Sequence, residues 1–221
     1  MELNLFVIDI LSYLSPIILL FGSMVALSTF KKYPNSKLVK FFSVLLLFSF
    51  INDIISRIFA YHFGSNLIFI NIYYLVELLL IFFYLHNKSL KYKNIFFGIF
   101  LFVFLFNMYE FLTVDFNDFT KFQSYSKSIN ALFLLIVSIS IIIKQIQDEK
   151  QLVLNKVIYL LPIYATINAL IGLPLNILVN YNYETIYYIW LINNINSIIF
   201  YIVSTYTLWK FGKTQKASLL G

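Results

Sequence analysis

Seven long apolar runs, separated by short polar connections, constrain this chain more than any other feature of its sequence. A helix needs about 20 mostly apolar residues to cross the hydrocarbon core of a bilayer. The runs are too long and too uniformly apolar for the alternating strands of a membrane barrel, so the backbone must be satisfied within helices. The sequence therefore predicts an all-α membrane protein, a seven-transmembrane-helix bundle that forms a single transmembrane domain over residues 1–221. The predicted helices cover residues 5–30, 38–62, 67–86, 94–112, 125–146, 156–179 and 185–210.

The composition agrees with lipid as the solvent. Hydrophobic residues make up 61% of the chain and charged residues 12%, with a mean hydropathy of +0.84. Soluble domains are about 45–50% apolar and about 25% charged, so one soluble core could not bury this much apolar surface. The first apolar run lacks a basic n-region and a small-residue cleavage site, and we expect it to be a retained helix rather than a signal peptide.

The lysines predict the orientation of the bundle. Basic residues gather on every second connection and at the C-terminal end, in register with seven crossings. Because basic loops stay in the cytoplasm, we expect a multi-pass protein of the cell inner membrane with its N-terminus outside and its C-terminus cytoplasmic. The same charge attracts anionic lipid headgroups, and nucleic acid is not expected as a partner. Of the 16 basic residues, 13 lie at these connections or at the C-terminal end, namely Lys31, Lys32, Lys37, Lys40, Lys88, Lys91, Lys93, Lys144, Lys150, Lys156, Lys210, Lys213 and Lys216.

Polar residues concentrate in the outer halves of the predicted helices. Asp53 and Arg57 are one turn apart and can pair, while Tyr73 precedes Glu77 by one turn on another helix. A charged side chain near the membrane centre costs roughly 2.5–3.5 kcal/mol, so each such residue is a hypothesis about function. The candidate ligand-binding residues are Asp53, Arg57, Glu77, Tyr73, Asn130, Asn168, Trp190, Asn193 and Asn194.

The inner halves of the helices carry no ionisable residue well inside the span, and their few hydroxyls can bond to their own helix. This asymmetry predicts a polar cavity open to the outside and floored by hydrophobic packing. Inside it, the acids Asp53, Glu77 and Glu110 and the bases Arg57 and Lys127 would compensate one another. A small polar or zwitterionic ligand could replace some of those contacts.

Each candidate also has a purely structural interpretation. Asp53 and Arg57 can form a structural ion pair, and the asparagines can join helices by hydrogen bonds. Trp190 can belong to the aromatic belt at the membrane interface. Glu110 and Lys127 can lie among the lipid headgroups. Glu77 is the hardest to explain in this way, because about ten residues of apolar span flank it on each side.

No enzymatic signature is present, and an enzyme is the less favoured interpretation. The chain contains no cysteine, no Gly-rich phosphate loop and neither H-E-x-x-H nor G-x-S-x-G. Its two histidines, His62 and His86, do not suffice for a histidine metal site. The last predicted helix has no mid-span lysine for a retinal Schiff base. We therefore expect no cofactor and no metal.

Three stretches resemble a group of small seven-helix inner-membrane proteins of Bacteroidota. They are NIYYLVELLL at 71–80, FQSYSKSINALFLLI at 122–136 and IWLINNINSIIFYI at 189–202. Members of the group have a Glu in the third helix, a Tyr-Ser-basic start to the fifth and a Trp followed by polar residues in the seventh. A His often follows that Trp, where this chain has Asn193 or Asn194. The resemblance implies the fold and a bacterial inner membrane, and it implies no activity.

The favoured function is therefore that of a receptor or sensor, which binds a small polar ligand from outside and signals to a membrane or cytoplasmic protein. A small-solute transporter, or a subunit of one, is the alternative. A further alternative is a structural subunit of a larger membrane complex.

Overall fold

The computed structural model describes residues 2–63, 66–86, 93–113, 125–147, 156–178 and 183–220. Within these ranges the chain forms seven α-helices and no other regular element. The helices are α1 (Glu2–Lys32), α2 (Lys37–Phe63), α3 (Leu67–His86), α4 (Lys93–Thr113), α5 (Ser126–Gln147), α6 (Lys156–Leu178) and α7 (Tyr183–Leu220).

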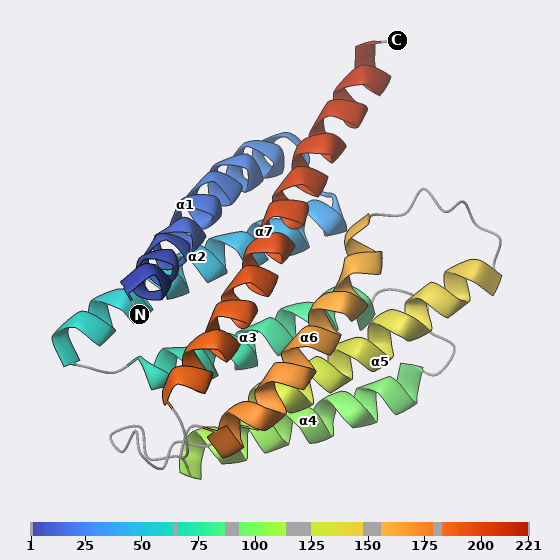
Figure 1. Ribbon diagram of the computed structural model, residues 1–221. Coiled ribbons are helices and arrows are strands. Elements are labelled where there is room, and N and C mark those ends of the chain that lie inside the picture. Colours follow the sequence, from blue (N-terminus) through green and yellow to red (C-terminus); the bar gives the residue numbers. More distant parts are fainter. Residues whose placement is uncertain are drawn as a thin grey trace.

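Successive helices run in opposite directions, and the two termini lie at opposite ends of the bundle (Figure 1). Helix α1 packs against α2 and α7, whereas α5 packs against α6 and also contacts α3 and α4. One end of the bundle, which we call the basic end, contains the C-terminal residues of α1 and α7 and the N-terminal residues of α2, α4 and α6. The described lysines there include Lys31, Lys32, Lys93, Lys210 and Lys213.

Four described helices are long and apolar enough to cross a membrane. They are Tyr13–Lys32 within α1, all of α2, all of α4, and Ser126–Ile143 within α5. Shorter apolar segments, Asn71–Tyr84 and Tyr159–Gly172, lie in α3 and α6. The helical bundle and its multi-pass membrane character are confirmed, while seven crossings and the N-out orientation stay predictions.

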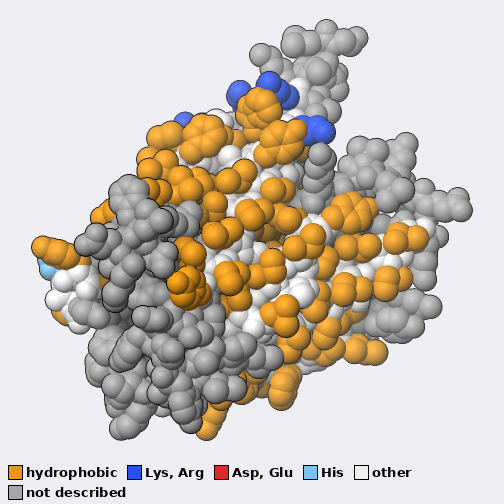
Figure 2. All heavy atoms as spheres, viewed as in Figure 1, with side chains coloured by type: hydrophobic (Ala, Val, Ile, Leu, Met, Phe, Trp, Pro, Cys, Tyr) orange, Lys and Arg blue, Asp and Glu red, His pale blue; other side chains and the backbone are white. Residues whose placement is uncertain are grey.

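Where its residues are described, the face of the bundle seen in Figure 2 is apolar over a wide area. Phe21, Phe102 and Leu170 are each about two-thirds exposed, at 64%, 67% and 67%. Soluble monomers rarely expose contiguous apolar patches larger than a few hundred Å². Lipid contact removes the cost of such a surface, so this exposure supports the membrane assignment independently of helix length.

The predicted helix boundaries agree with the structure to within three residues, except at the end of α7. That helix continues for ten residues beyond Lys210, to Leu220. The prediction was wrong there because the apolar run stops while the residues that follow still favour a helix. The first turn of the extension is held by Tyr33, whose hydroxyl donates to the Gly212 carbonyl at 3.3 Å and whose ring meets Phe211 edge-on.

Apolar and polar packing separate along the bundle axis, as the sequence predicts. The fully buried apolar side chains lie largely in the helix halves nearer the basic end, including Phe42, Ile81, Ile141, Leu161 and Leu208. Some hydroxyls in these halves bond to their own helix, with Ser138 donating to the Leu135 carbonyl at 3.0 Å and Thr207 to the Val203 carbonyl at 2.8 Å. Others join α1 to α2, with Ser43 donating to the Ala26 carbonyl at 3.2 Å and Ser23 to the Leu46 carbonyl at 3.4 Å.

Buried amide and ionisable side chains lie instead between the middle of the bundle and the end opposite the basic end. Among the described residues they include Asn71, Glu77, Asn107, Glu110, Lys127, Asn130, Asn168 and Asn196. Hydrophobic packing therefore closes the bundle on the basic-end side of these polar side chains. The candidate site lies at the boundary between the two regions.

Candidate functional site

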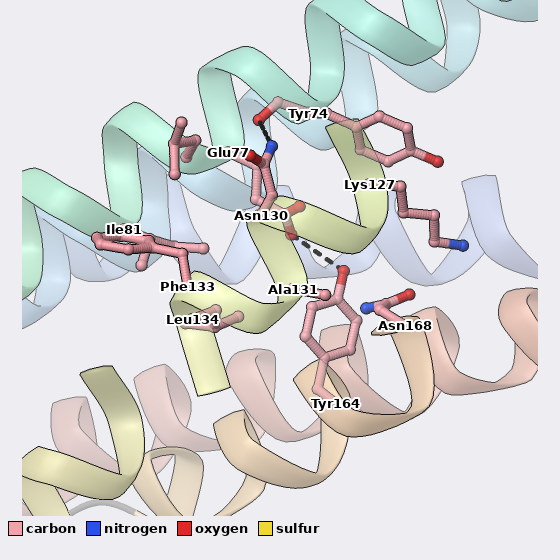
Figure 3. Close-up of a pocket in the computed structure, with 11 residues that line it drawn as sticks. Tyr74, Glu77, Ile81, Lys127, Asn130, Ala131, Phe133, Leu134, Tyr164 and Asn168 are labelled. Carbon is pink, nitrogen blue, oxygen red and sulfur yellow. Dashed lines mark hydrogen bonds between the residues drawn. The ribbon is translucent and has the colours of Figure 1, made fainter. Parts of the chain in front are cut away.

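A small cavity lies where α3, α5 and α6 meet, at the boundary between the polar and apolar halves (Figure 3). Its volume is about 20 Å³. A cavity needs about 10–15 Å³ to hold one water molecule, so this one has the size of a water and not of a larger ligand. The polar lining comes from Tyr74, Glu77, Lys127, Asn130, Tyr164 and Asn168, and the apolar lining from Leu78, Ile81, Ala131, Phe133 and Leu134.

Glu77 projects from the middle of α3 into this cavity and is 9% exposed. The hydroxyl of Tyr164 in α6 donates a hydrogen bond to its Oε1 at 3.0 Å. Leu78 and Ile81 continue the same helix toward the apolar half. The carboxyl group therefore sits among helices, away from lipid, and joins α3 to α6.

Lys127 enters the same cavity from the first turn of α5. Its Nζ donates a short hydrogen bond to Oδ1 of Asn193 in α7. In the described part of the chain no ion pair joins Lys127 to Glu77, and the one described salt bridge lies in α2. An amine and a carboxyl group thus line one cavity while each is bonded to an uncharged partner.

Asn130 joins three helices beside this cavity. Its Nδ2 donates to the carbonyl of Tyr74 in α3 at 2.9 Å and to Oδ1 of Asn107 in α4 at 3.2 Å. Asn107 donates in return to Oδ1 of Asn130 at 2.8 Å. The interpretation of asparagine as an interhelical contact therefore holds for Asn130, which also lines the cavity together with Asn168.

A second polar cluster links α2, α3 and α7 next to the site. The hydroxyls of Tyr73 and Tyr201 lie 3.0 Å apart, and Ser49 donates to Tyr73 at 3.5 Å. Tyr73 is outside the cavity lining, but its side chain interacts with the Glu77 carboxyl group, as their spacing of one turn predicts.

The ion pair predicted between Asp53 and Arg57 is present but lies outside the cavity lining. Arg57 Nε donates to Asp53 Oδ2 at 2.8 Å, and Nη2 to Oδ1 at 3.4 Å. The side chains are 22% and 40% exposed for Asp53 and Arg57. The cavity lining contains neither residue, so this pair and Glu77 do not share that cavity, and a role of the pair in ligand binding stays a prediction.

The helix 7 candidates divide into three cases. Asn193 reaches the site through Lys127. Asn194 lies in α7, half-buried and outside the cavity lining. Trp190 also lies in α7, but its side chain is outside the part of the chain that the structure describes.

Glu110 and Lys127 do not face the outside of the bundle. They are 6% and 8% exposed, so both point into the bundle. The Glu110 carboxylate accepts hydrogen bonds from the first residues of α5. Burial keeps both side chains from direct contact with lipid headgroups. The sequence could not show this, because a position near a helix end does not reveal whether the side chain turns toward lipid or toward the next helix.

Tyr164 and Asn196 are absent from the ligand-binding residues predicted from the sequence, although Asn196 was expected to join helices by hydrogen bonds. Tyr164 is 5% exposed and holds Glu77, while Asn196 donates to the Tyr164 carbonyl at 3.2 Å. One available signal was the spacing of Tyr164 and Asn168, which are one turn apart on α6. With 17 tyrosines in the chain, that signal does not stand out.

The described residues contain no group of three or more His, Asp or Glu side chains that could hold a metal ion. Within this part of the chain, the chemistry of the site is hydrogen bonding and charge, from one carboxyl group, one amine, two amides and two phenols.

Fold and site together define an all-α bundle of the multi-pass membrane class with a buried polar cluster in one half. No family model, no curated protein and no solved structure matches the chain. The resemblance to the Bacteroidota group is therefore a prediction from three stretches of sequence.

Proposed function

We propose that this chain is a bacterial inner-membrane receptor or sensor that binds a small zwitterionic ligand among α3, α5 and α6. The observation that carries the proposal is the placement of Glu77 and Lys127. Both line one cavity, both are buried, and each is bonded to an uncharged group rather than to the other. Buried charges are costly unless they are paired, and a zwitterion supplies a partner for each of them.

The ligand chemistry follows from these two groups. A ligand ammonium would replace the Tyr164 hydroxyl at Glu77, and a ligand carboxylate or other anionic group would bind the Lys127 ammonium. The cavity of about 20 Å³ has room for no more than about one water molecule, so a ligand of several atoms must separate the helices to enter. Ligand binding is thereby coupled to a helix movement.

Helix α7 is the element best placed to report that movement. Asn193 bonds to Lys127, and Asn196 bonds to the backbone of α6 at Tyr164. A ligand that displaces either contact changes the packing of α7, which extends to Leu220 at the basic end. With that end in the cytoplasm, as the lysines predict, α7 carries the change to a partner there.

Packing at the basic-end side of the cavity favours binding over transport. Phe133 lines the cavity, and behind it Phe100 stacks on Phe82 with ring centroids 3.7 Å apart. A transported solute would have to cross this aromatic layer. Proteoliposomes loaded with protein test the transporter alternative directly, since uptake of a labelled amino acid that depends on Glu77 would establish it in place of a receptor.

The binding proposal is tested by thermal unfolding of the purified protein in lipid nanodiscs. Free amino acids and glycine betaine are the probes, and a zwitterion that binds raises the midpoint by mass action. Glu77→Gln and Lys127→Met should each abolish the rise. Asp53→Asn and Lys93→Met remove a charge of the same sign away from the cavity and should preserve it. The proposal is contradicted if no zwitterion raises the unfolding midpoint, or if the two control variants lose the rise as completely as Glu77→Gln and Lys127→Met do.

A further inference from the structure

A second, much larger hollow runs along the outer surface between α1 and α7. Its volume is about 630 Å³, within the ~300–1,000 Å³ of sites that hold small molecules. All but one of its lining side chains are apolar or aromatic. They are Ile17, Ile18 and Phe21 from α1, and Ile202, Thr205, Tyr206 and Trp209 from α7. We refer to it as the α1–α7 groove.

The wall formed by α7 ends in a positive charge. Ile202, Tyr206, Trp209 and Lys213 follow one another at helical spacing on one face. The Nζ of Lys213 lies 3.9 Å from the centre of the Trp209 ring, a cation–π contact that holds the ammonium at the end of the groove.

The wall formed by α1 ends in the same way. Lys31 lies about four turns beyond Ile17, and Lys32 about three turns beyond Phe21, so the two lysines come back to about the same face. Both lysines are exposed, at the end of the bundle where basic side chains gather beside α7 (Figure 2).

The acidic residues of the two helices, Glu2 and Asp9 in α1 and Glu184 in α7, are far from these lysines in the sequence. The sequence contains no Asp or Glu between residues 10 and 52 or between residues 185 and 221. The groove therefore joins an apolar wall to a positively charged end, and its complement is an apolar chain attached to an anion.

The dimensions suit one leaflet of a bilayer. At 1.5 Å per residue, the α7 wall from Ile202 to Lys213 is about 16 Å long. This is about half of the ~30 Å hydrocarbon core of a bilayer, the depth reached by one acyl chain. A transmembrane helix of a partner protein would cross both leaflets and would bring no phosphate to the lysines.

We propose that the α1–α7 groove binds an anionic phospholipid. One acyl chain lies along Ile17, Phe21, Ile202 and Tyr206, and the phosphate lies at Lys213 with Lys31 beside it. Trp209 separates the two regions, as tryptophan does at membrane interfaces. The lipid covers the seam where α1 meets α7 and so ties the long C-terminal helix to the bundle.

The test is native mass spectrometry of the full chain released from detergent, with phosphatidylglycerol and phosphatidylcholine of matched chains in competition. The expected result is one retained phosphatidylglycerol per protein. Lys213→Met should weaken retention about fivefold, the loss expected for one lysine near an anionic headgroup. Lys93→Met removes an exposed lysine at the same end of the bundle, on α4, and should leave retention unchanged.

Two further measurements identify the molecule that occupies the groove. Ile17→Trp fills the groove at an exposed position and should reduce retention without altering the far-UV circular dichroism of the protein. Inorganic phosphate at millimolar concentration should not displace the lipid, because it lacks the acyl chain. Equal retention of the two lipids, an equal loss in Lys93→Met, or a dimer that Ile17→Trp dissociates would overturn the proposal, the last by showing that a second copy covers the groove.

Discussion

The carboxylate of Glu110, near the end of α4, accepts hydrogen bonds from both the backbone N–H and the hydroxyl of Ser126, at 2.9 and 3.0 Å. The backbone N–H of Tyr125 donates to the same oxygen at 3.1 Å. These groups stand at the start of α5, where helical N–H groups lack partners within the helix. Glu110 is thus a cap supplied by the preceding helix, and it fixes the first turn of α5, from which Lys127 enters the site.

Loss of this cap should destabilise the bundle. Glu110→Ala leaves the N–H groups of Tyr125 and Ser126 without their acceptor, and we expect a loss of about 1–2 kcal/mol in the free energy of unfolding, the usual cost of a lost N-cap. Denaturant titration in mild detergent measures it. Glu110→Gln keeps one acceptor oxygen and should lose less, so equal losses in the two variants would argue against capping.

The close approach of α5 and α6 depends on Gly172. A Cβ atom at this position would lie 2.2 Å from Ser128 Oγ and 3.3 Å from Ser128 Cβ. Gly172→Ala should therefore cost about 1–3 kcal/mol, the usual range for overpacking. Gly98→Ala is the matched control, because nothing lies within 4 Å of its added Cβ, and it should be neutral or stabilising by up to about 1 kcal/mol.

A double variant isolates the contact at Gly172. Adding Ser128→Ala removes the nearest atom and leaves contacts at 3.3 Å, so part of the stability should return. A double-variant cycle of unfolding free energies gives the coupling between the two positions. Additive losses would mean that the alanine at 172 is accommodated in some other way.

The Asn107–Asn130 pair should be energetically coupled. Each amide donates to the other, and Asn130 also donates to the Tyr74 carbonyl. Interhelical hydrogen bonds in membranes are worth about 0.6–1.7 kcal/mol, so Asn130→Leu should cost more than Asn107→Leu, and the double variant less than the sum. Thermal unfolding in nanodiscs of the two single variants and the double variant measures this. An additive double variant would show that the two amides do not act together.

The sequence predicts the helices of this chain better than it predicts their contacts. Hydropathy places most helix ends within three residues because the bilayer sets the length of each apolar run. It fails at the end of α7, where a polar helix is held by Tyr33 through contacts with Phe211 and Gly212. No local pattern contains that interaction, since the two segments are far apart in the sequence.

The same limit applies to the site. Glu77 stands out from sequence because an acid in an apolar span is rare, and it lines the cavity. Tyr164 does not stand out in the sequence, since tyrosine is common in this chain. Its role comes from its hydrogen bond to Glu77, which lies on another helix. Asp53 and Arg57 were correctly paired by their spacing, yet spacing within one helix does not show whether that face turns toward Glu77.

Breaking the Asp53–Arg57 ion pair should destabilise the bundle more than removing both of its charges. Asp53 and Arg57 lie within α2, an apolar helix suited to crossing a membrane, and each is only partly exposed. Arg57→Gln leaves the Asp53 carboxylate without its bidentate partner, which should cost roughly 1–3 kcal/mol in lipid. Asp53→Asn together with Arg57→Gln removes both charges and should recover most of that loss. Unfolding midpoints in nanodiscs compare the variants with the parent chain. A double variant less stable than Arg57→Gln alone would mean that the pair contributes more than mutual compensation, for example through further partners of Asp53.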